Sequence, residues 1–128
     1  VMEATREFAD PAYRIDVLKV EIPVNLAYVA GFGTSEFSRN EALEAFRYAA
    51  AVANTVPIVY LSAGVSFEWF EESLRLARKA GVEAAGFMCG RAIWSDAIIE
   101  FGEGGESRLN DWLLGEGRNR LKRLKAAL

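Results

Sequence analysis

Lys19 and Glu21 stand two residues apart in an otherwise apolar run, IDVLKVEIP, at residues 15–23. Alternate residues of a strand point to the same side, so both side chains would face one space, opposite Leu18 and Val20. An ammonium group is costly to bury unless it is paired or neutral. Two interpretations follow. Lys19 and Glu21 form a salt bridge, or Lys19 is a nucleophile, because an apolar, partly enclosed site lowers the pKa of a lysine amine and favours Schiff-base formation with a carbonyl.

The chain of 128 residues contains no histidine. This absence excludes Ser-His-Asp and Cys-His nucleophile systems, zinc sites with histidine ligands and imidazole acid–base catalysis within the chain. Lysine, carboxylate, tyrosine and hydroxyl chemistry remain. Of the four lysines, Lys79, Lys122 and Lys125 fall on the charged faces of predicted helices, so Lys19 alone lacks an explanation as a surface cation.

Two glycine-containing stretches could bind an anion. SAGVS, at 62–66, follows one predicted strand and leads into a helix, so its backbone N–H groups could bind phosphate. CGRA, at 89–92, follows the next strand, where Gly90 permits close approach of the backbone and Arg91 supplies a charge-assisted partner. Either stretch alone is common in turns, and only their shared position after consecutive strands favours a phosphate site.

The elements that position these residues alternate between strand and helix. Ser38 and Glu41 have the spacing of a capping box, Ser66 can cap the following helix, and Gly81 can end it. In order, the pattern predicts a helix over 2–8, a strand over 15–23, a helix from about 41, a strand over 57–64, a helix over 67–80, a strand over 83–90, and helices over 91–100, 105–114 and from about 117. Short βα connections of this kind require parallel strands and predict an α/β fold.

Three parallel strands alone would leave two open edges and an uncovered sheet face. We therefore expect them to belong to a larger sheet or barrel. The chain begins with Val1 rather than methionine, so either further chain precedes it or another copy supplies the missing strands.

Three stretches, DVLKVEIPVN, PIVYLSAGVS and GFMCGRAIW, resemble the last three strands of the class I tagatose-bisphosphate aldolases. This is a Schiff-base family with a (β/α)8 TIM-barrel fold, and sulfosugar-phosphate aldolases are among its relatives. The resemblance covers nearly the whole chain, and the three motifs together are more specific than any one. It implies that residues 1–128 form one partial barrel domain, the C-terminal three βα units, approximately strands six to eight.

The resemblance also implies an activity: cleavage of a phosphorylated ketose, such as tagatose 1,6-bisphosphate, into dihydroxyacetone phosphate and an aldehyde phosphate, without metal or cofactor. Lys19 would form the Schiff base, and Glu21 would be a partner in the barrel interior. A proton-transfer glutamate would lie upstream of Val1. The residues that the resemblance assigns to the phosphate are Ser62, Ala63, Gly64, Met88, Gly90 and Arg91.

Two alternatives remain open beside this activity. A sulfosugar-phosphate aldolase would use the same mechanism on a sulfonated substrate. A barrel fragment that associates with itself and binds phosphate without turnover would be no enzyme. The length of the intact gene product, and trapping of an imine in the presence of substrate, separate these readings.

Composition limits the partners. The net charge of −3 gives no general attraction to nucleic acid, and no apolar run approaches the roughly 20 residues of a membrane span. The single cysteine excludes an internal disulfide and favours a reducing, cytoplasmic setting. We expect a phosphorylated sugar and a second copy of the chain, or a missing N-terminal barrel half, as partners. The basic residues near the C-terminus are interpreted as a solvated helix face: Arg118, Arg120, Lys122, Arg123 and Lys125.

Overall fold

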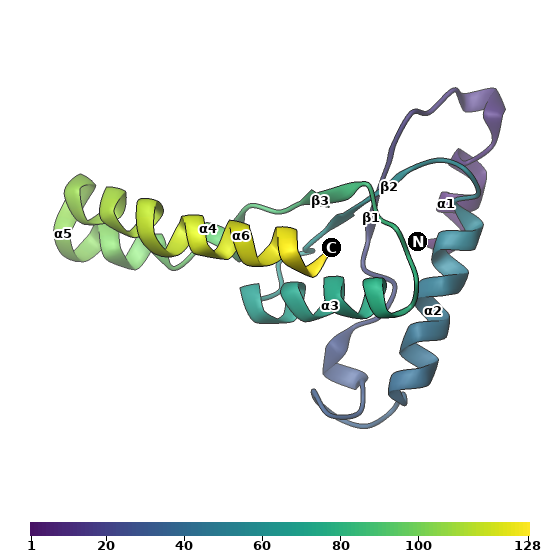
Figure 1. Ribbon diagram of the computed structural model, residues 1–128, viewed down its shortest axis with the longest axis horizontal. Coiled ribbons are helices and arrows are strands. Elements are labelled where there is room, and N and C mark those ends of the chain that lie inside the picture. The colour runs from purple at the N-terminus through teal and green to yellow at the C-terminus, as the bar shows by residue number, and fades with distance from the viewer.

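A parallel sheet of three strands, in the order β1-β2-β3, lies at the centre of the structure (Figure 1). The structure is a computed structural model, and it describes residues 1–128. Its elements are α1 (Met2–Phe8), η1 (Pro11–Tyr13), β1 (Leu18–Glu21), η2 (Leu26–Tyr28), α2 (Arg39–Val52), β2 (Ile58–Leu61), α3 (Phe67–Lys79), β3 (Gly86–Met88), α4 (Arg91–Trp94), α5 (Ala97–Trp112), η3 (Leu113–Gly117) and α6 (Arg118–Ala127). The predicted α/β class and the parallel order of the strands are confirmed.

The two faces of the sheet differ sharply in burial. On one face, Tyr60 of β2 is fully buried and packs edge-on against Phe46 of α2, and Phe87 of β3 packs in the same way against Phe70 of α3. The opposite face, which carries Lys19, is open to solvent along β1. Both β1 and β3 also have one unpaired edge. An apolar sheet open on one face and at both edges has the form of a piece of a larger barrel wall.

The helix boundaries follow local signals in the sequence. The Ser38 backbone N–H donates to Glu41 Oε2 at 2.7 Å, and the Glu41 N–H donates to Ser38 Oγ at 3.2 Å, which completes the predicted capping box. Ser66 Oγ caps α3 by accepting the N–H of Trp69 at 3.3 Å. Gly81, with φ +81°, follows α3 in the left-handed conformation that ends many helices.

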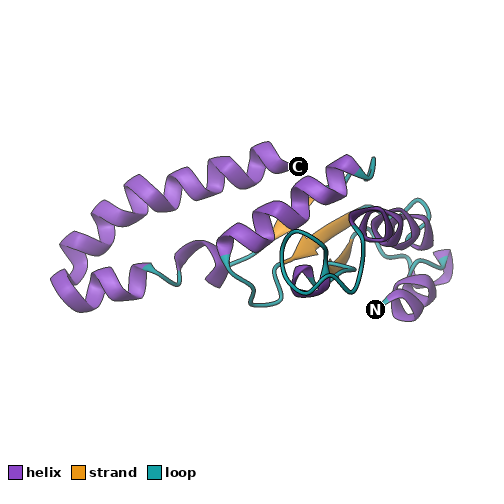
Figure 2. Ribbon diagram, turned by 90° about the horizontal axis from the view of Figure 1, so that it is seen from below, coloured by secondary structure: helices purple, strands orange, loops and turns teal.

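The C-terminal third differs from the prediction in two places. The helix predicted over 91–100 is interrupted, because α4 ends at Trp94 and α5 begins at Ala97. The predicted gap before residue 117 is wrong: the π-helical turn η3 joins α5 directly to α6. The predicted break in the glycine-rich stretch is correct, since Gly105 has φ +66° inside α5. The chain reverses there and forms a helical hairpin (Figure 2).

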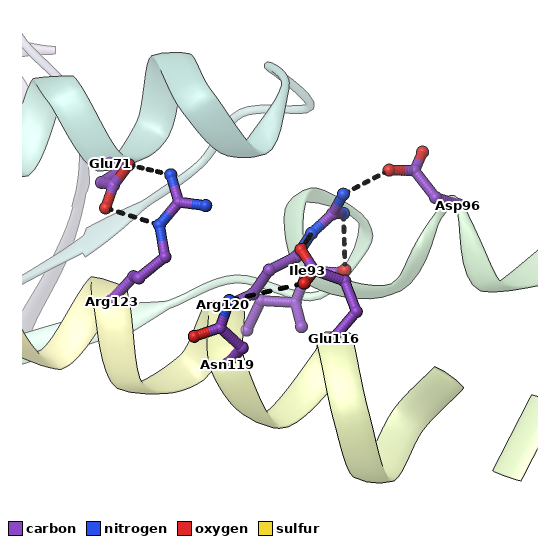
Figure 3. A network of polar contacts seen from close by, with 7 residues as sticks. All are labelled: Glu71, Ile93, Asp96, Glu116, Asn119, Arg120 and Arg123. Atoms are coloured by element: carbon purple, nitrogen blue, oxygen red, sulfur yellow. Dashed lines mark hydrogen bonds and ion pairs between the residues drawn. The ribbon is translucent and has the colours of Figure 1, made fainter. Parts of the chain in front are cut away.

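The base of this hairpin is held by two arginines of α6 (Figure 3). Arg123 donates to both carboxylate oxygens of the buried Glu71, at 3.0 and 2.5 Å. Arg120 donates to Asp96 at 2.6 Å, to the Ile93 carbonyl at 3.0 Å and to Glu116 at 3.0 Å. The interpretation of the C-terminal basic residues as a wholly solvated face is therefore wrong for these two arginines, which also pair with Asp96 and Glu71 far away in the sequence.

No helix of the structure combines the length and the apolar character that are needed to cross a membrane.

Candidate active site

Lys19 lies on the open face of β1, two residues before Glu21 ends the strand. The register pairs it with Val59 of β2, and Val59 in turn pairs with Gly86 of β3. Lys19 is in none of the ion pairs of the structure, which include no pair with Glu21. The salt-bridge interpretation therefore finds no support, and the amine is free to meet a ligand on the open face.

The loop after β2 presents backbone donors at the carboxyl end of the sheet. Ala63 and Gly64 are successive residues with positive φ, +50° and +84°, and neither donates its N–H to a backbone carbonyl. Positive φ is uncommon for alanine and marks a locally constrained turn. The turn is closed by the Val65 N–H, which donates to the Ser62 carbonyl at 3.1 Å. Two adjacent free N–H groups of this kind suit an anion.

Arg91 reaches the same loop from the end of β3. A Cβ built on Gly64 would lie 3.5 Å from Arg91 Nη2, so the guanidinium lies beside the loop and occupies the space next to Gly64. Arg91 is in no ion pair, and neither its backbone N–H nor that of Gly90 donates to a backbone carbonyl. The structure thus brings the two predicted phosphate-binding stretches together.

Glu21 connects two hollows on this side of the molecule. One, of about 240 Å³, lies between Glu21 and Ser62 at the strand ends. The other, of about 270 Å³, is lined by Lys19 and Glu21 and by residues of α1, along the unpaired edge of β1. Lys19 therefore lies further from the strand ends than Ser62, and Glu21 lines the hollows beside both residues.

Met88 ends β3, and Cys89, which follows it, lies in a different environment. Met88 is 57% exposed and pairs with Leu61, which pairs with Glu21, so it lies on the same open face as Lys19. Burial raises the pKa of the Cys89 thiol to about 11, so the sulfur is protonated near neutral pH and is a poor nucleophile. No group of three acidic or cysteine side chains lies close enough to hold a metal ion.

Sequence reasoning did not single out Asn25 and Trp69, which also line the hollow beside Ser62. Asn25 follows β1 and accepts the Ala27 N–H at 3.0 Å, so its amide is fixed at the carboxyl end of the sheet. An asparagine before a turn is common, and Trp69 sits in an ordinary amphipathic helix. Neither residue has a spacing that would distinguish it from a structural one.

The loop between β1 and α2 folds over this same end of the sheet. Its two arms are joined by backbone hydrogen bonds between Phe37 and Tyr28 and between Ala30 and Phe37, each of 2.8 Å. Gly33 permits the closest approach, because a Cβ there would lie 2.0 Å from the Ala27 carbonyl oxygen. The loop is thus a compact structure of its own beside the candidate site.

Comparison with known proteins defines the class. Residues 1–96 match the sequence profile of the DeoC/LacD family aldolases, and the chain belongs to this family. The family has a TIM-barrel fold, so the three parallel βα units are part of such a barrel. The predicted fold class and the family resemblance are confirmed, whereas the assignment of the units to strands six to eight stays a prediction.

Individual relatives are similar over the whole chain. It is 42% identical over 130 residues to a tagatose 1,6-diphosphate aldolase 2 of Enterococcus faecalis, and 40% identical over 128 residues to tagatose 1,6-diphosphate aldolase 1 of the same organism. It is also 42% identical to a tagatose 1,6-diphosphate aldolase of Staphylococcus aureus. All of the chain is covered in each case, but it spans only about two-fifths of these relatives' length, 39% for the first.

Proposed function

We propose that the full-length protein is a class I aldolase that cleaves a phosphorylated ketose, such as tagatose 1,6-bisphosphate, into dihydroxyacetone phosphate and an aldehyde phosphate. The observation that carries the proposal is the position of Lys19, which is unpaired on the open sheet face below the Gly64–Arg91 pair. Similarity to proteins named tagatose 1,6-diphosphate aldolase supports the choice of substrate.

In the proposed reaction, the neutral amine of Lys19 adds to the C2 ketone, and loss of water gives an iminium ion. A base removes the proton of the C4 hydroxyl, the C3–C4 bond breaks, and its electron pair forms an enamine as the aldehyde leaves. Protonation at C3 and hydrolysis release dihydroxyacetone phosphate and regenerate Lys19. We expect the proton-transfer group on a neighbouring barrel strand outside residues 1–128.

The phosphate next to the ketone would be held by Arg91 and by the N–H groups of Ala63 and Gly64. Ser62, Met88 and Gly90 would border it from the ends of β2 and β3. Charge-assisted hydrogen bonds from a guanidinium and from fixed backbone dipoles stabilise a phosphate without requiring a metal. Binding at this end of the sheet would place the adjacent carbonyl over the open face that carries Lys19.

The test is reductive trapping in the full-length protein. Borohydride added with dihydroxyacetone phosphate should attach the three-carbon unit to Lys19, as located by peptide mass spectrometry. Lys19→Arg should abolish both labelling and cleavage, because a guanidinium keeps the charge but is not a nucleophile near neutral pH. Lys79→Arg, at an exposed position on α3, is the matched control and should change neither. Normal cleavage by Lys19→Arg would overturn the proposal.

A further inference from the structure

Glu21 lies beside Lys19 on the open face of the sheet. The strand register places Lys19 in one row across the three strands and Glu21 in the next row towards their carboxyl ends. The other residues of these two rows are Val59 and Gly86 in the row of Lys19, and Leu61 and Met88 in the row of Glu21. None of these four has a polar side chain. A carboxylate on an apolar face that the rest of the barrel would enclose requires a partner or a function.

The structure gives Glu21 no charged partner. Neither Glu21 nor Lys19 takes part in an ion pair. Both line the hollow of about 270 Å³ along the unpaired edge of β1, and Glu21 also lines the hollow of about 240 Å³ beside Ser62. No other carboxylate lines either hollow. Glu21 is therefore the one carboxylate of residues 1–128 that shares a hollow with the Lys19 amine.

The spacing of the two residues fits a proton transfer through a bound substrate. Residues two positions apart on a strand have Cα atoms about 6.5–7 Å apart and side chains on the same side. Because Lys19 and Glu21 form no direct ion pair, a substrate atom next to the amine can lie between them. In the proposed reaction that atom is the C2 oxygen, which becomes a hydroxyl when the amine adds to the ketone.

We propose that Glu21 is the acid–base catalyst for Schiff-base formation on Lys19, an inference that rests on the proposed aldolase function. The Glu21 carboxylate takes one proton from the Lys19 ammonium, and the neutral amine adds to C2 while the π electrons of the carbonyl move to its oxygen. Glu21 protonates this oxygen and then takes a second proton from the nitrogen. It donates that proton as the C2–O bond breaks, so water leaves and the nitrogen lone pair forms the iminium ion.

Protons and charge balance within this sequence of steps. The oxygen gains two protons, the nitrogen loses two, and Glu21 ends as the carboxylate with which it began. The group that removes the proton of the C4 hydroxyl is a different one, expected outside residues 1–128. Loss of Glu21 therefore slows formation and hydrolysis of the imine but leaves the base for C3–C4 cleavage in place.

A salt-bridge role for Glu21 predicts the opposite effect on the rate. A carboxylate that paired with Lys19 would hold it in the ammonium form, so its removal would leave more neutral amine at pH 7. Glu21→Gln would then form the imine faster. Under the proposal this variant forms the imine more slowly, because a carboxamide cannot transfer the protons.

The experiment follows the C2 oxygen of dihydroxyacetone phosphate in the full-length protein. With heavy oxygen at C2, mass spectrometry measures the loss of label to water above the rate without protein. This exchange requires imine formation and hydrolysis but no C–C cleavage. Glu21→Gln should lower the exchange rate at saturating substrate by about 10²–10⁴-fold, the usual contribution of general acid–base catalysis, and Glu21→Asp should recover part of it. The side chain is exposed, so the circular dichroism spectrum should not change.

Glu83→Gln is the matched control. Glu83 is an exposed carboxylate without an ion pair that precedes β3, at the amino end of the sheet, and its substitution should leave the exchange rate unchanged. An equal loss in Glu83→Gln and Glu21→Gln would overturn the proposal.

Lys19→Arg separates failure of this inference from failure of the proposed function. Exchange at the unchanged rate in Lys19→Arg would overturn the Schiff-base assignment itself. If Lys19→Arg abolishes exchange, a normal or faster rate in Glu21→Gln would overturn only the role of Glu21. A Glu21→Gln rate that saturating substrate restores would do the same, because the side chain would then bind substrate without transferring protons.

Discussion

The guanidinium of Arg91 lies beside Gly64, although 27 positions of sequence separate them, with 3.5 Å between Nη2 and the place that a Cβ of residue 64 would take. This proximity brings together the loops after β2 and β3 at one end of the sheet. Both residues are exposed, so an anion from solvent can reach the guanidinium and the N–H of Gly64 together. Three predictions follow from this proximity and from two buried polar groups.

The first prediction concerns phosphate. Arg91→Ala in the full-length protein should weaken binding of dihydroxyacetone phosphate by about 1.5–3 kcal/mol, the usual range for hydrogen bonds to a charged group. Imine formation with unphosphorylated dihydroxyacetone should persist, because Lys19 is unchanged. Isothermal titration and borohydride trapping measure the two effects. Lys79→Ala removes the same charge from an exposed site and should change neither. Equal phosphate affinity in Arg91→Ala and Lys79→Ala would contradict the assignment.

The second prediction concerns acid stability. The hydrogen bonds from Arg123 lower the pKa of Glu71 from its ordinary value of 4.5, with a further contribution from Arg75. A lowered pKa in the folded state contributes stability above pH 4.5 that is lost as the pH falls through the folded-state value. Glu71→Gln should therefore lower the free energy of unfolding by about 1.5–3 kcal/mol at pH 7, and by less as the pH falls below about 4.

Urea unfolding at pH 7 and at pH 3 measures this difference in the free energy of unfolding. Glu72→Gln, one position along α3, is the matched control because Glu72 forms no ion pair in the structure. The free energies of unfolding of Glu71→Gln and of the unchanged protein could instead differ by the same amount at pH 7 and at pH 3. That result would show that the carboxylate charge does not stabilise the base of the hairpin.

The third prediction concerns Tyr60, whose hydroxyl is buried between the sheet and the helices without a hydrogen-bond partner. Tyr60→Phe should raise the free energy of unfolding by about 1 kcal/mol, because an unsatisfied polar group is removed and the ring is kept. Tyr28→Phe, at a 44% exposed site, should have no such effect. Chemical denaturation at pH 7 compares the variants.

The pH dependence provides an independent check on Tyr60. Burial raises the pKa of its hydroxyl from 10.0 to about 12. The stability that depends on the neutral form is complete below pH 10 and is lost as the pH rises towards 12, because the unfolded chain ionises first. The unchanged protein should therefore lose more stability than Tyr60→Phe across this window. Parallel losses would mean that burial does not raise the pKa of this hydroxyl in the folded protein.

The helix ends and the strand faces that the sequence predicted correctly depend on residues that are close together in the sequence. Ser38 and Glu41 are three positions apart, and Gly81 directly follows the α3 cap, so their pattern determines their structure without reference to the rest of the chain. The alternation around Lys19 similarly predicted which face of β1 is buried. The candidate site followed because strands in parallel order bring their carboxyl ends to one edge.

The errors concern contacts between residues that are distant in the sequence. Arg120 and Arg123 look like solvated residues of a basic helix, and only the fold places Asp96 and Glu71 against them. The π-helical turn at Leu113–Gly117 likewise replaces the gap predicted between the helix over 105–114 and the helix from about 117, although this turn contains two glycines. Intrinsic helix preference disfavours glycine by only about 1 kcal/mol, which is small against the packing of α6 along α3.

The two unpaired strand edges have a consequence for how the full-length protein folds. Within these three units each strand pairs with the next along the chain, so the contacts form over short loops. Closing the barrel instead requires strands at the beginning and the end of the polypeptide to meet, and chain entropy makes such distant pairing slow. We therefore expect closure of the barrel to limit the folding rate. Until it closes, the partly formed sheet can associate with other chains through its unpaired strand edges.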